Sequence, residues 1–414
     1  MSESTIKKLK AMEIEQPTFT SYVEDWLVRV RAGDLGSLPI IIGIIAIAAI
    51  FGTLSEGIFF RERNFVNLLL QMSGLAAIST GVVFVLLIAE IDLSVGFVGA
   101  VGGVTMTLLL REANADWPWW AAIGASLLVV TLIGLLHGLI ITKASVPSFV
   151  VTLAGLLAWS GVVLILTTSF STAGTIVIQD PVVLGIANSY LPTLWGWTLF
   201  VVAVLFYAGT QISTQQSLRN KNLAGKPSAV IALEVIALIV LAGGAVWYAN
   251  QDRGVPTSAV IVIVFLLIWS FVANRTKFGR YVYAVGGNPE AARRAGIDVD
   301  RIRISVFMIS SFMAGIGGII LASRLRSVDT NTGGGNLLLN AIAAAVIGGT
   351  SLFGGSGKVT SALLGALIIA SVENGMGLMG WASGVKFVVN GSVLLAAVLV
   401  DSFSRRSRSA SGIA

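Results

Sequence analysis

Two carboxylates, Glu90 and Asp92, stand between long apolar stretches in the segment AEIDLSVG at residues 89–96. A charge at membrane depth costs at least about 2.5–3.5 kcal/mol, so it needs a partner, a water-filled cavity or a break in the helix. One interpretation is a broken helix in which Glu90, Asp92 and Ser94 line a translocation path, because irregular backbone is tolerated where it faces protein or water. The other is a tight cytoplasmic turn with both carboxylates solvated. The spacing leaves both open.

A compact helix signature, NPEAARRAG, lies in the longest basic loop, residues 274–303. Asn288 is a good N-cap, Pro289 suits the first helical position, and Glu290 complements the positive end of a helix. Gly296 can end the helix in the left-handed conformation. A helix of about two turns is too short to persist alone in water, so packing must hold it.

The side chains of this short helix suit it to docking on a partner. The small residues Ala291, Ala292 and Ala295 would let another surface approach closely. Arg293 and Arg294 are placed to meet acidic groups of that partner. A short, basic helix on the cytoplasmic face is what a membrane subunit needs to engage a motor domain. The alternative is an ordinary basic loop that obeys the positive-inside rule, and the defined caps favour docking over this.

Several other features carry no catalytic chemistry. The run GGSGK at 354–358 resembles a phosphate-binding loop, but that loop needs glycine and Ser/Thr at the positions of Leu352 and Val359. Any ATP hydrolysis must therefore come from a separate polypeptide. His137 is the sole histidine and the chain has no cysteine, so we expect no metal site, no cofactor and no catalytic residue.

Polar residues inside two apolar stretches near the end of the chain give a weaker signal. Glu373 with Asn374, and Lys386 with Asn390, interrupt stretches that are otherwise apolar. They either line a polar path or pair with each other. The sequence does not distinguish these interpretations.

The composition indicates that most of the surface faces something other than water. Hydrophobic residues make up 55% of the 414 residues and charged residues 12%, with a mean hydropathy of +0.88. A soluble domain carries about 25% charged residues because its surface must be solvated. This composition excludes a soluble globular protein with one large core.

Twelve apolar stretches predict an all-α integral membrane protein, a polytopic bundle of about 12 transmembrane spans. Several stretches are shorter than about 17 residues, so half-helices are one interpretation. The motif GxxxG at 99–103 and again at 134–138 predicts close helix packing and nothing more. The stretches are 38–54, 67–89, 93–110, 117–142, 147–167, 194–209, 229–248, 258–272, 304–321, 338–353, 359–379 and 385–400.

The placement of the basic residues predicts that both termini are cytoplasmic. With the N-terminus inside and twelve alternating spans, 20 of the 27 Lys and Arg residues fall on the cytoplasmic side. The net charge of +6 therefore reflects membrane topology and does not indicate a nucleic-acid partner.

The chain organises into three predicted regions. Residues 1–36 form a cytoplasmic tail, either loosely ordered or with an interfacial helix; 37–402 form the transmembrane permease domain; and 403–414 form a basic cytoplasmic tail. The two polar outer loops, 168–193 and 327–336, are either partner-binding segments or simple connectors.

Four motifs together give the chain a specific resemblance over residues 64–401. They are AEIDLSVG at 89–96, VPSFVVTLAG at 146–155, FGRYVYAVGGNPEAARRAGI at 278–297 and AAAVIGGTSL at 343–352. In these motifs the chain resembles the permeases of bacterial ABC importers of the ribose, xylose and branched-chain amino acid type. Sugar members have about ten spans, so residues 194–248 look like an inserted helix pair, as in the xylose members.

The resemblance implies the other subunits of a complete importer. Two copies of the permease would form the pathway in the lipid of the bacterial inner membrane, and a periplasmic sugar-binding protein would deliver a monosaccharide, D-xylose first among the candidates. Two ATP-binding subunits would dock on the cytoplasmic loop, so this chain would be a transport subunit and not an enzyme. The family's coupling helix corresponds here to Asn288, Pro289, Glu290, Ala291, Ala292 and Gly296.

Three alternatives remain at this point. One is the same importer type for arabinose, galactose or ribose. Another is an ion-coupled secondary transporter using Glu90, Asp92 and Glu373, although no repeat between the two halves is visible. The third is an intramembrane enzyme, which lacks a nucleophile–base pair beyond His137 and scattered serines.

Overall fold

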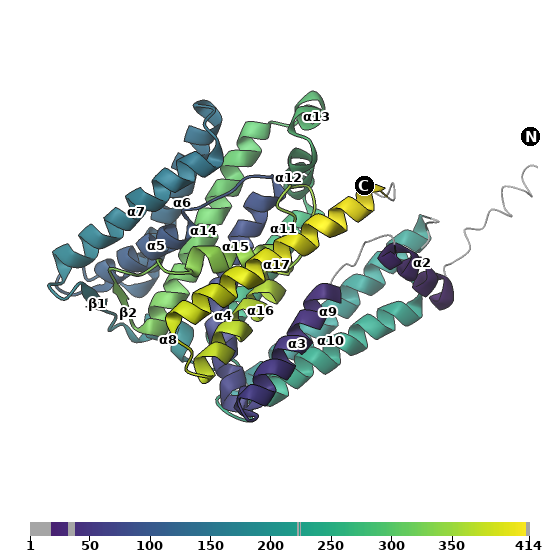
Figure 1. Ribbon diagram of the computed structural model, residues 1–414, viewed down its shortest axis with the longest axis horizontal. Helices are drawn as coiled ribbons and strands as arrows, with labels where there is room; N and C mark the ends of the chain where they lie inside the picture. Colours follow the sequence, from purple (N-terminus) through teal and green to yellow (C-terminus); the bar gives the residue numbers. More distant parts are fainter. Residues whose placement is uncertain (1–17, 32–37, 222, 224, 411–414) are drawn as a thin grey trace, which may run out of the picture. The chain divides into compact units, whose positions relative to one another are not determined.

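The computed structural model describes residues 18–31, 38–221, 223 and 225–410, and these are almost entirely helical (Figure 1). Within these ranges, eight helices are long and apolar enough to cross a membrane. They are α4 (Glu62–Leu87), α6 (Trp119–Lys143), α7 (Ser148–Phe170), α9 (Thr193–Asn220), α10 (Ser228–Ala249), α11 (Thr257–Arg275), α14 (Val299–Leu325) and α16 (Ser361–Leu378).

Four further apolar helices occupy the remaining predicted stretches. They are α3 (Leu38–Leu54), α5 (Val95–Leu110), α15 (Leu337–Ile347) and α17 (Ser383–Ala410). The predicted helical class is confirmed, whereas the number of spans and the sides of the termini stay predictions. The remaining elements are α2 (Phe19–Arg31), η1 (Ile58–Phe60), β1 (Thr175–Val177), α8 (Pro181–Asn188), α12 (Lys277–Gly287), α13 (Pro289–Arg294) and β2 (Ser327–Asp329).

Contacts along the chain divide it into two compact units. The core unit comprises residues 36–190 and 256–403, and the hairpin unit comprises 191–255 with the two ends of the chain. Of the predicted N-terminal tail, residues 1–17 and 32–36 lie outside the described residues, as do 411–414 of the basic C-terminal tail. Helix α2 covers the tail segment with helical spacing, and its position on a membrane surface stays a prediction.

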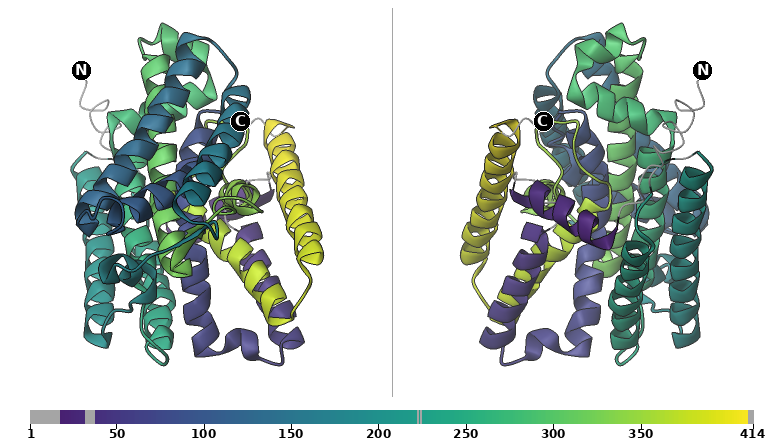
Figure 2. Two further views of the ribbon diagram at one scale, coloured as in Figure 1. Left: turned by 90° about the vertical axis from the view of Figure 1, so that its left-hand side faces the viewer. Right: turned by 90° about the vertical axis from the view of Figure 1, so that its right-hand side faces the viewer.

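The core unit is built around α4 and α14, whose apolar stretches are largely buried; α14 packs against α4, α5 and α6 (Figures 1 and 2). Glycines let neighbouring helices approach α14 at backbone distance. A Cβ added to Gly99 would lie 2.7 Å from the Ala314 carbonyl oxygen, and one on Gly134 would lie 2.5 Å from that of Phe307. One on Gly318 would overlap the backbone of Gly99. Both predicted GxxxG motifs therefore pack against the same helix.

For the stretch at 338–353, the structure supports the half-helix interpretation and not a full-length helical span. Helix α15 ends at Ile347 after 11 residues, or about 16 Å at 1.5 Å per residue, against about 30 Å for the membrane interior. Gly349, Gly354 and Gly357 in the following loop all have positive φ, which ordinary residues avoid and which ends helical geometry. The segment is therefore a half-length helix followed by a glycine-rich loop, residues 348–360.

The two predicted outer loops pair with each other. Strands β1 and β2 are antiparallel, with Ile176 opposite Val328, and both of these side chains are buried. Ser323 at the end of α14 accepts a hydrogen bond from the Ala187 backbone N–H at 2.9 Å, which ties α8 to the same place. These contacts give the loops a structural role as connectors within the core unit.

The hairpin unit contains the helix pair α9 and α10. The Glu234 carboxylate on α10 accepts hydrogen bonds from the Tyr207 hydroxyl on α9 and from the Lys226 ammonium in the turn. Burial lowers the pKa of Lys226, but the hydrogen bond and charge of Glu234 outweigh burial and raise it above its ordinary value. Most apolar side chains of these two helices are exposed, which suits a surface that contacts lipid.

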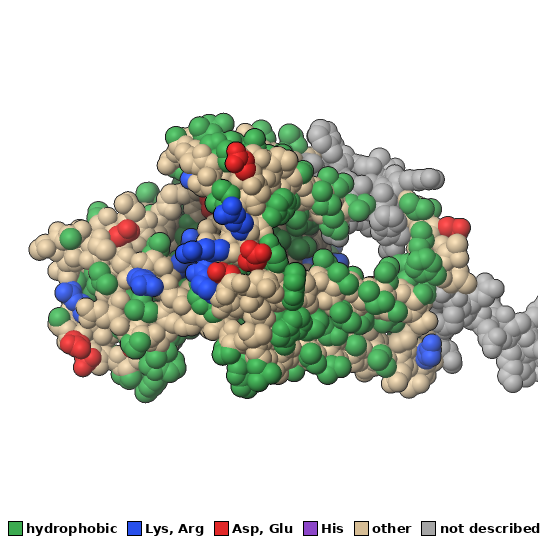
Figure 3. Space-filling view, turned by 90° about the horizontal axis from the view of Figure 1, so that it is seen from below, with side chains coloured by type: hydrophobic (Ala, Val, Ile, Leu, Met, Phe, Trp, Pro, Cys, Tyr) green, Lys and Arg blue, Asp and Glu red, His purple; other side chains and the backbone are tan. Residues whose placement is uncertain are grey.

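Apolar side chains are widespread on the surface of the protein as a whole. On the face shown in Figure 3, charged side chains are few and several of them gather in one place. This distribution agrees with the low share of charged residues in the composition.

The glycine packing around α14 predicts a steep cost for a side chain at Gly318. Gly318→Val should lower the Tm of the purified protein in detergent by several degrees, because overpacking costs about 1–3 kcal/mol or more. Gly124→Val is the matched control, since a Cβ at this helical glycine meets nothing within 4 Å. Equal Tm losses for the two variants would show that helix propensity, and not the contact with α14, governs the effect.

Candidate functional site

Helices α12 and α13 lie at one end of the core unit, next to the start of α14 (Figures 1 and 2). The predicted N-cap is present, because Asn288 Oδ1 accepts a hydrogen bond from the Ala291 backbone N–H at 3.0 Å. Pro289 occupies the first helical position, and Gly296 has φ +83°, the left-handed conformation predicted for it. The local signature thus forms the short helix that its residues predict.

The surfaces of α13 differ from the expected all-alanine docking face. Ala292 is buried against the core unit, whereas Ala291 and Ala295 are exposed. Arg293 forms ion pairs with Glu290 and Asp300 of the same chain. Arg294 is exposed and has no ion pair to any residue that the structure describes. Arg294 therefore remains available for a partner, and Arg293 is largely engaged.

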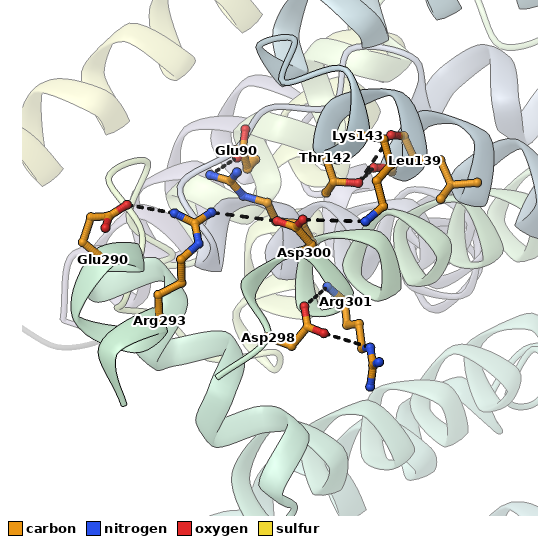
Figure 4. Close-up of polar contacts among 11 residues, drawn as sticks. Glu90, Leu139, Thr142, Lys143, Glu290, Arg293, Asp298, Asp300 and Arg301 are labelled. Atoms are coloured by element: carbon orange, nitrogen blue, oxygen red, sulfur yellow. Dashed lines mark hydrogen bonds and ion pairs between the residues drawn. The ribbon is translucent and has the colours of Figure 1, made fainter. Parts of the chain in front are cut away.

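Arg293 begins a line of charged contacts across this end of the protein (Figure 4). Its guanidinium lies 2.8 Å from Glu290 and 3.8 Å from Asp300, and Lys143 at the end of α6 lies 4.0 Å from Asp300 on its other side. These pairs are partly exposed, so each contributes at most about 1 kcal/mol. Their consequence is positional, because they link α13 to α6 and α14.

Glu90 joins the same region through a less exposed pair. Its carboxylate lies 3.0 Å from the Arg303 guanidinium on α14, and the two side chains are 13% and 26% exposed. Glu90, Arg303, Asp300 and Arg293 line one polar cavity of about 240 Å³, together with residues of the turn between α6 and α7. Two features that the sequence presents separately, the carboxylate segment and the short helix, therefore meet in space.

Asp92 and Ser94 lie away from this cavity, in a buried hydrogen-bond network. Asp92 Oδ1 accepts from the Ser94 hydroxyl at 2.6 Å, and Oδ2 accepts from the Ser310 hydroxyl on α14 at 3.0 Å. Asp92 is 3% exposed, so the interpretation as a fully solvated turn is wrong for this carboxylate. The segment is nevertheless a break: residues 88–94 are not helical, and Ala89 has φ +60°. The role of Glu90, Asp92 and Ser94 in a path stays a prediction.

The network continues through the single histidine. Trp159 Nε1–H donates to His137 Nε2 at 3.1 Å, so in the neutral ring Nδ1 carries the proton. This nitrogen lies 3.5 Å from the Ser94 hydroxyl. His137 thus joins three elements. It lies on α6, accepts a hydrogen bond from Trp159 on α7, and lies next to Ser94 in the break between α4 and α5.

A further part of this site has no clear sequence signal. The glycine-rich loop 348–360 closes over the end of α4, where the Gly355 N–H donates to the Leu87 carbonyl at 2.9 Å. A Cβ on Gly286 of α12 would overlap the same carbonyl. The Tyr283 hydroxyl donates to the Gly357 carbonyl at 2.9 Å, and burial raises the pKa of this tyrosine. The glycines of GGSGK allow the loop to pack closely against neighbouring backbone. Only the fold shows that this backbone belongs to α4 and α12.

Comparison with known proteins connects this geometry to a family. The family model described as the permease component of the branched-chain amino acid transport system matches residues 64–400. The chain belongs to this family. It is 38% identical over 376 residues to the xylose transport system permease protein XylH of Escherichia coli (strain K12), covering 90% of this chain and 93% of the relative.

Two other relatives of this permease are similar over most of their lengths. The xylose transport system permease protein XylH of Haemophilus influenzae is 34% identical, over 92% of this chain and 100% of its own length. The ribose import permease protein RbsC of Escherichia coli (strain K12) is 34% identical, over 87% of this chain and 92% of its own. No solved structure matches. With eight helices of spanning length among its described residues, the permease is a multi-pass membrane protein.

The α13 end of the permease is connected to the centre of the core unit by charged contacts. Ion pairs connect α13 to α14 and α6 through Arg293 and Asp300, and Arg303 of α14 pairs with Glu90 in the break after α4. The short helix thus contacts α14 directly, and its neighbour α12 and the glycine-rich loop contact the end of α4.

The Glu90–Arg303 pair should be energetically coupled. A double-mutant cycle of Glu90→Gln and Arg303→Leu, measured by thermal unfolding in detergent, should give a coupling energy of about 1 kcal/mol or more because the pair is poorly solvated. The cycle of Asp298→Asn and Arg301→Leu is the matched control: that pair is 2.8 Å apart on the same helix but 50% and 86% exposed. It should give less than about 0.5 kcal/mol. Equal coupling energies in the two cycles would show that the Glu90–Arg303 pair contributes no more to stability than an exposed ion pair.

Proposed function

We propose that the protein is the membrane-spanning permease subunit of an ATP-binding-cassette importer that carries a monosaccharide, D-xylose first among the candidates, across the bacterial inner membrane. The observation that carries the proposal is the similarity to xylose permeases over nine-tenths of the chain. The ribose permease is also similar, at 34% identity, so ribose is the second candidate substrate.

The energy source in this proposal lies in separate ATP-binding subunits. The GGSGK run lacks the flanking residues of a phosphate-binding loop, and it belongs to a loop that packs on the end of α4 and on α12. Two such subunits would engage the cytoplasmic face of a dimer of this chain. A periplasmic binding protein would present the sugar on the opposite face.

Helix α13 is the proposed docking element, with Asn288, Pro289, Glu290, Ala291, Ala292, Arg293, Arg294 and Gly296 forming or supporting it. Its caps hold the helix in shape without a partner, so docking costs little ordering. Exposed Arg294 offers charge to the partner, and Arg293 relays the movement of α13 to Asp300. The cavity beside Glu90 would change shape as that movement reaches the break between α4 and α5.

Charge reversal at the exposed arginine tests the docking role. Arg294→Glu should reduce sugar-stimulated ATP hydrolysis by the assembled importer at least tenfold, since an unpaired or repelled charge at an interface costs about 1.4 kcal/mol or more. Lys221→Glu is the control, because this exposed residue lies in the hairpin unit on the same predicted side of the membrane. Coupling that is unchanged in Arg294→Glu, with normal insertion, would contradict the assignment of α13.

Dependence on the partner tests the transport class. Sugar uptake by cells should stop when the gene of the partner ATP-binding subunit is deleted, and it should persist when the proton gradient is collapsed with ATP maintained. An importer without a coupling ion requires this pattern. The opposite pattern would identify an ion-coupled secondary transporter, and competition among xylose, ribose, arabinose and galactose in the same assay would rank the substrates.

A further inference from the structure

A second polar cluster lies far from α13, where three helices of the core unit meet. Asn340 on α15 donates from Nδ2 to the Glu373 carboxylate on α16 at 2.6 Å. Asn390 on α17 donates from Nδ2 to the same Glu373 oxygen at 3.3 Å and lies 3.4 Å from Asn340 Oδ1. Arg324 lies in the last turn of α14. One carboxylate thus gathers amide groups from two other helices.

The hydrogen-bond network of this cluster leaves one buried acceptor without a donor from the residues that the structure describes. Asn390 is 7% exposed, yet its Oδ1 has no hydrogen-bond partner among the described residues. Glu373 forms no ion pair within 4 Å in the described part of the chain. A buried acceptor without a partner costs about 1–3 kcal/mol, so it is rarely kept for packing alone.

The neighbouring amide pair gives an internal comparison. Asn64 and Asn374 exchange two hydrogen bonds, at 2.9 and 3.0 Å, and each is 7% exposed. That pair is satisfied and joins α4 to α16 as interhelical hydrogen bonds do. Glu373 is the adjacent residue on α16, but its cluster retains one buried acceptor without a partner among the described residues, Asn390 Oδ1. The two groups therefore differ in how completely their hydrogen bonds are satisfied, although they share a helix.

The position of the cluster suits an entrance for solute. Asn340 lies in the first turn of half-length α15, Glu373 lies near the end of α16, and Arg324 lies at the end of α14. On the predicted topology all three are toward the outer side of the membrane. Short or broken helices often contribute solute sites in transport proteins.

We propose that Glu373, Asn340 and Asn390 form a binding site for the hydroxyl groups of a monosaccharide on its way through the core unit. Carboxylate oxygens accept from sugar hydroxyls, and amide groups both donate and accept, so the cluster matches a ligand that offers both on adjacent carbons. The orphan Asn390 Oδ1 would accept one of these hydroxyls. This inference rests on the proposed function and names the part of the path that touches the sugar.

The test uses the complete importer in proteoliposomes, with its binding protein and ATP-binding subunits, and compares D-xylose with its deoxy analogues. Glu373→Gln and Asn390→Leu should each lower the rate of xylose uptake about tenfold, the size expected for losing a hydrogen bond that involves a charged group. They should also reduce the preference for xylose over one deoxy analogue. The variant and the unaltered importer use the same binding protein, so the selectivity of that protein contributes equally to both ratios and does not affect the comparison between them.

Asn374→Leu is the matched control for a packing role. It should lower the Tm but leave the ratio of xylose to analogue uptake as in the unaltered protein. The absence of cysteine allows a second measurement that does not depend on uptake. Asn390→Cys should react with a small water-soluble thiol reagent, and turnover with xylose should slow this reaction several-fold. Val388→Cys, on the exposed side of α17, should show no such protection.

The outcomes separate the two proposals. Absence of ATP-driven xylose uptake by the unaltered importer would overturn the proposed function. Normal uptake by that importer, combined with unchanged rates and ratios in Glu373→Gln and Asn390→Leu, would overturn the sugar site alone. The same holds if the two variants lose uptake with an unchanged ratio, as a loss of packing would produce.

Discussion

The close approach of α4, α5 and α6 to α14 is the constraint on which the core unit depends. Glycines on both sides of these contacts remove the side chains that would otherwise separate the helices. In a membrane, where lipid tails are as apolar as leucine, such contact supplies the packing and hydrogen bonding that hold helices together. The same contact places Ser310 of α14 within 3.0 Å of Asp92 and so allows a carboxylate to be buried at the break after α4.

Helix α14 connects three regions of different chemistry. Its first turns carry Asp300 and Arg303, which contact α13, α6 and the Glu90 segment. Its middle carries Ser310, which donates a hydrogen bond to Asp92, and its last turn carries Arg324. Helix α14 therefore forms a continuous route from the α13 end of the core unit to the end at which Arg324 lies. The coupling role of that route belongs to the proposed function.

Local signals predicted the short elements well. The caps of α13 depend on Asn288, Pro289 and Gly296, whose conformations are set within a few residues, and each takes its expected place. Hydropathy likewise located the eight long apolar helices and the four shorter ones, although it did not indicate α8. At 338–353 the apolar stretch extends past the helix, because apolar residues continue through a loop whose glycines end the helix at Ile347. Hydropathy records that a segment is apolar, and it does not record whether the backbone there is helical or irregular.

The sequence by itself determined the membrane class, the helical segments, the caps of the docking helix and the family, since these follow from composition, local conformation and ordered motifs. Only the tertiary structure decided the partners of Glu90 and Asp92. These carboxylates are two residues apart in sequence, yet Glu90 pairs with Arg303 and Asp92 accepts a hydrogen bond from Ser310. It also decided that Asn374 is satisfied and Asn390 is not. Partners of buried polar groups come from distant helices, and their distances depend on packing that no local pattern encodes.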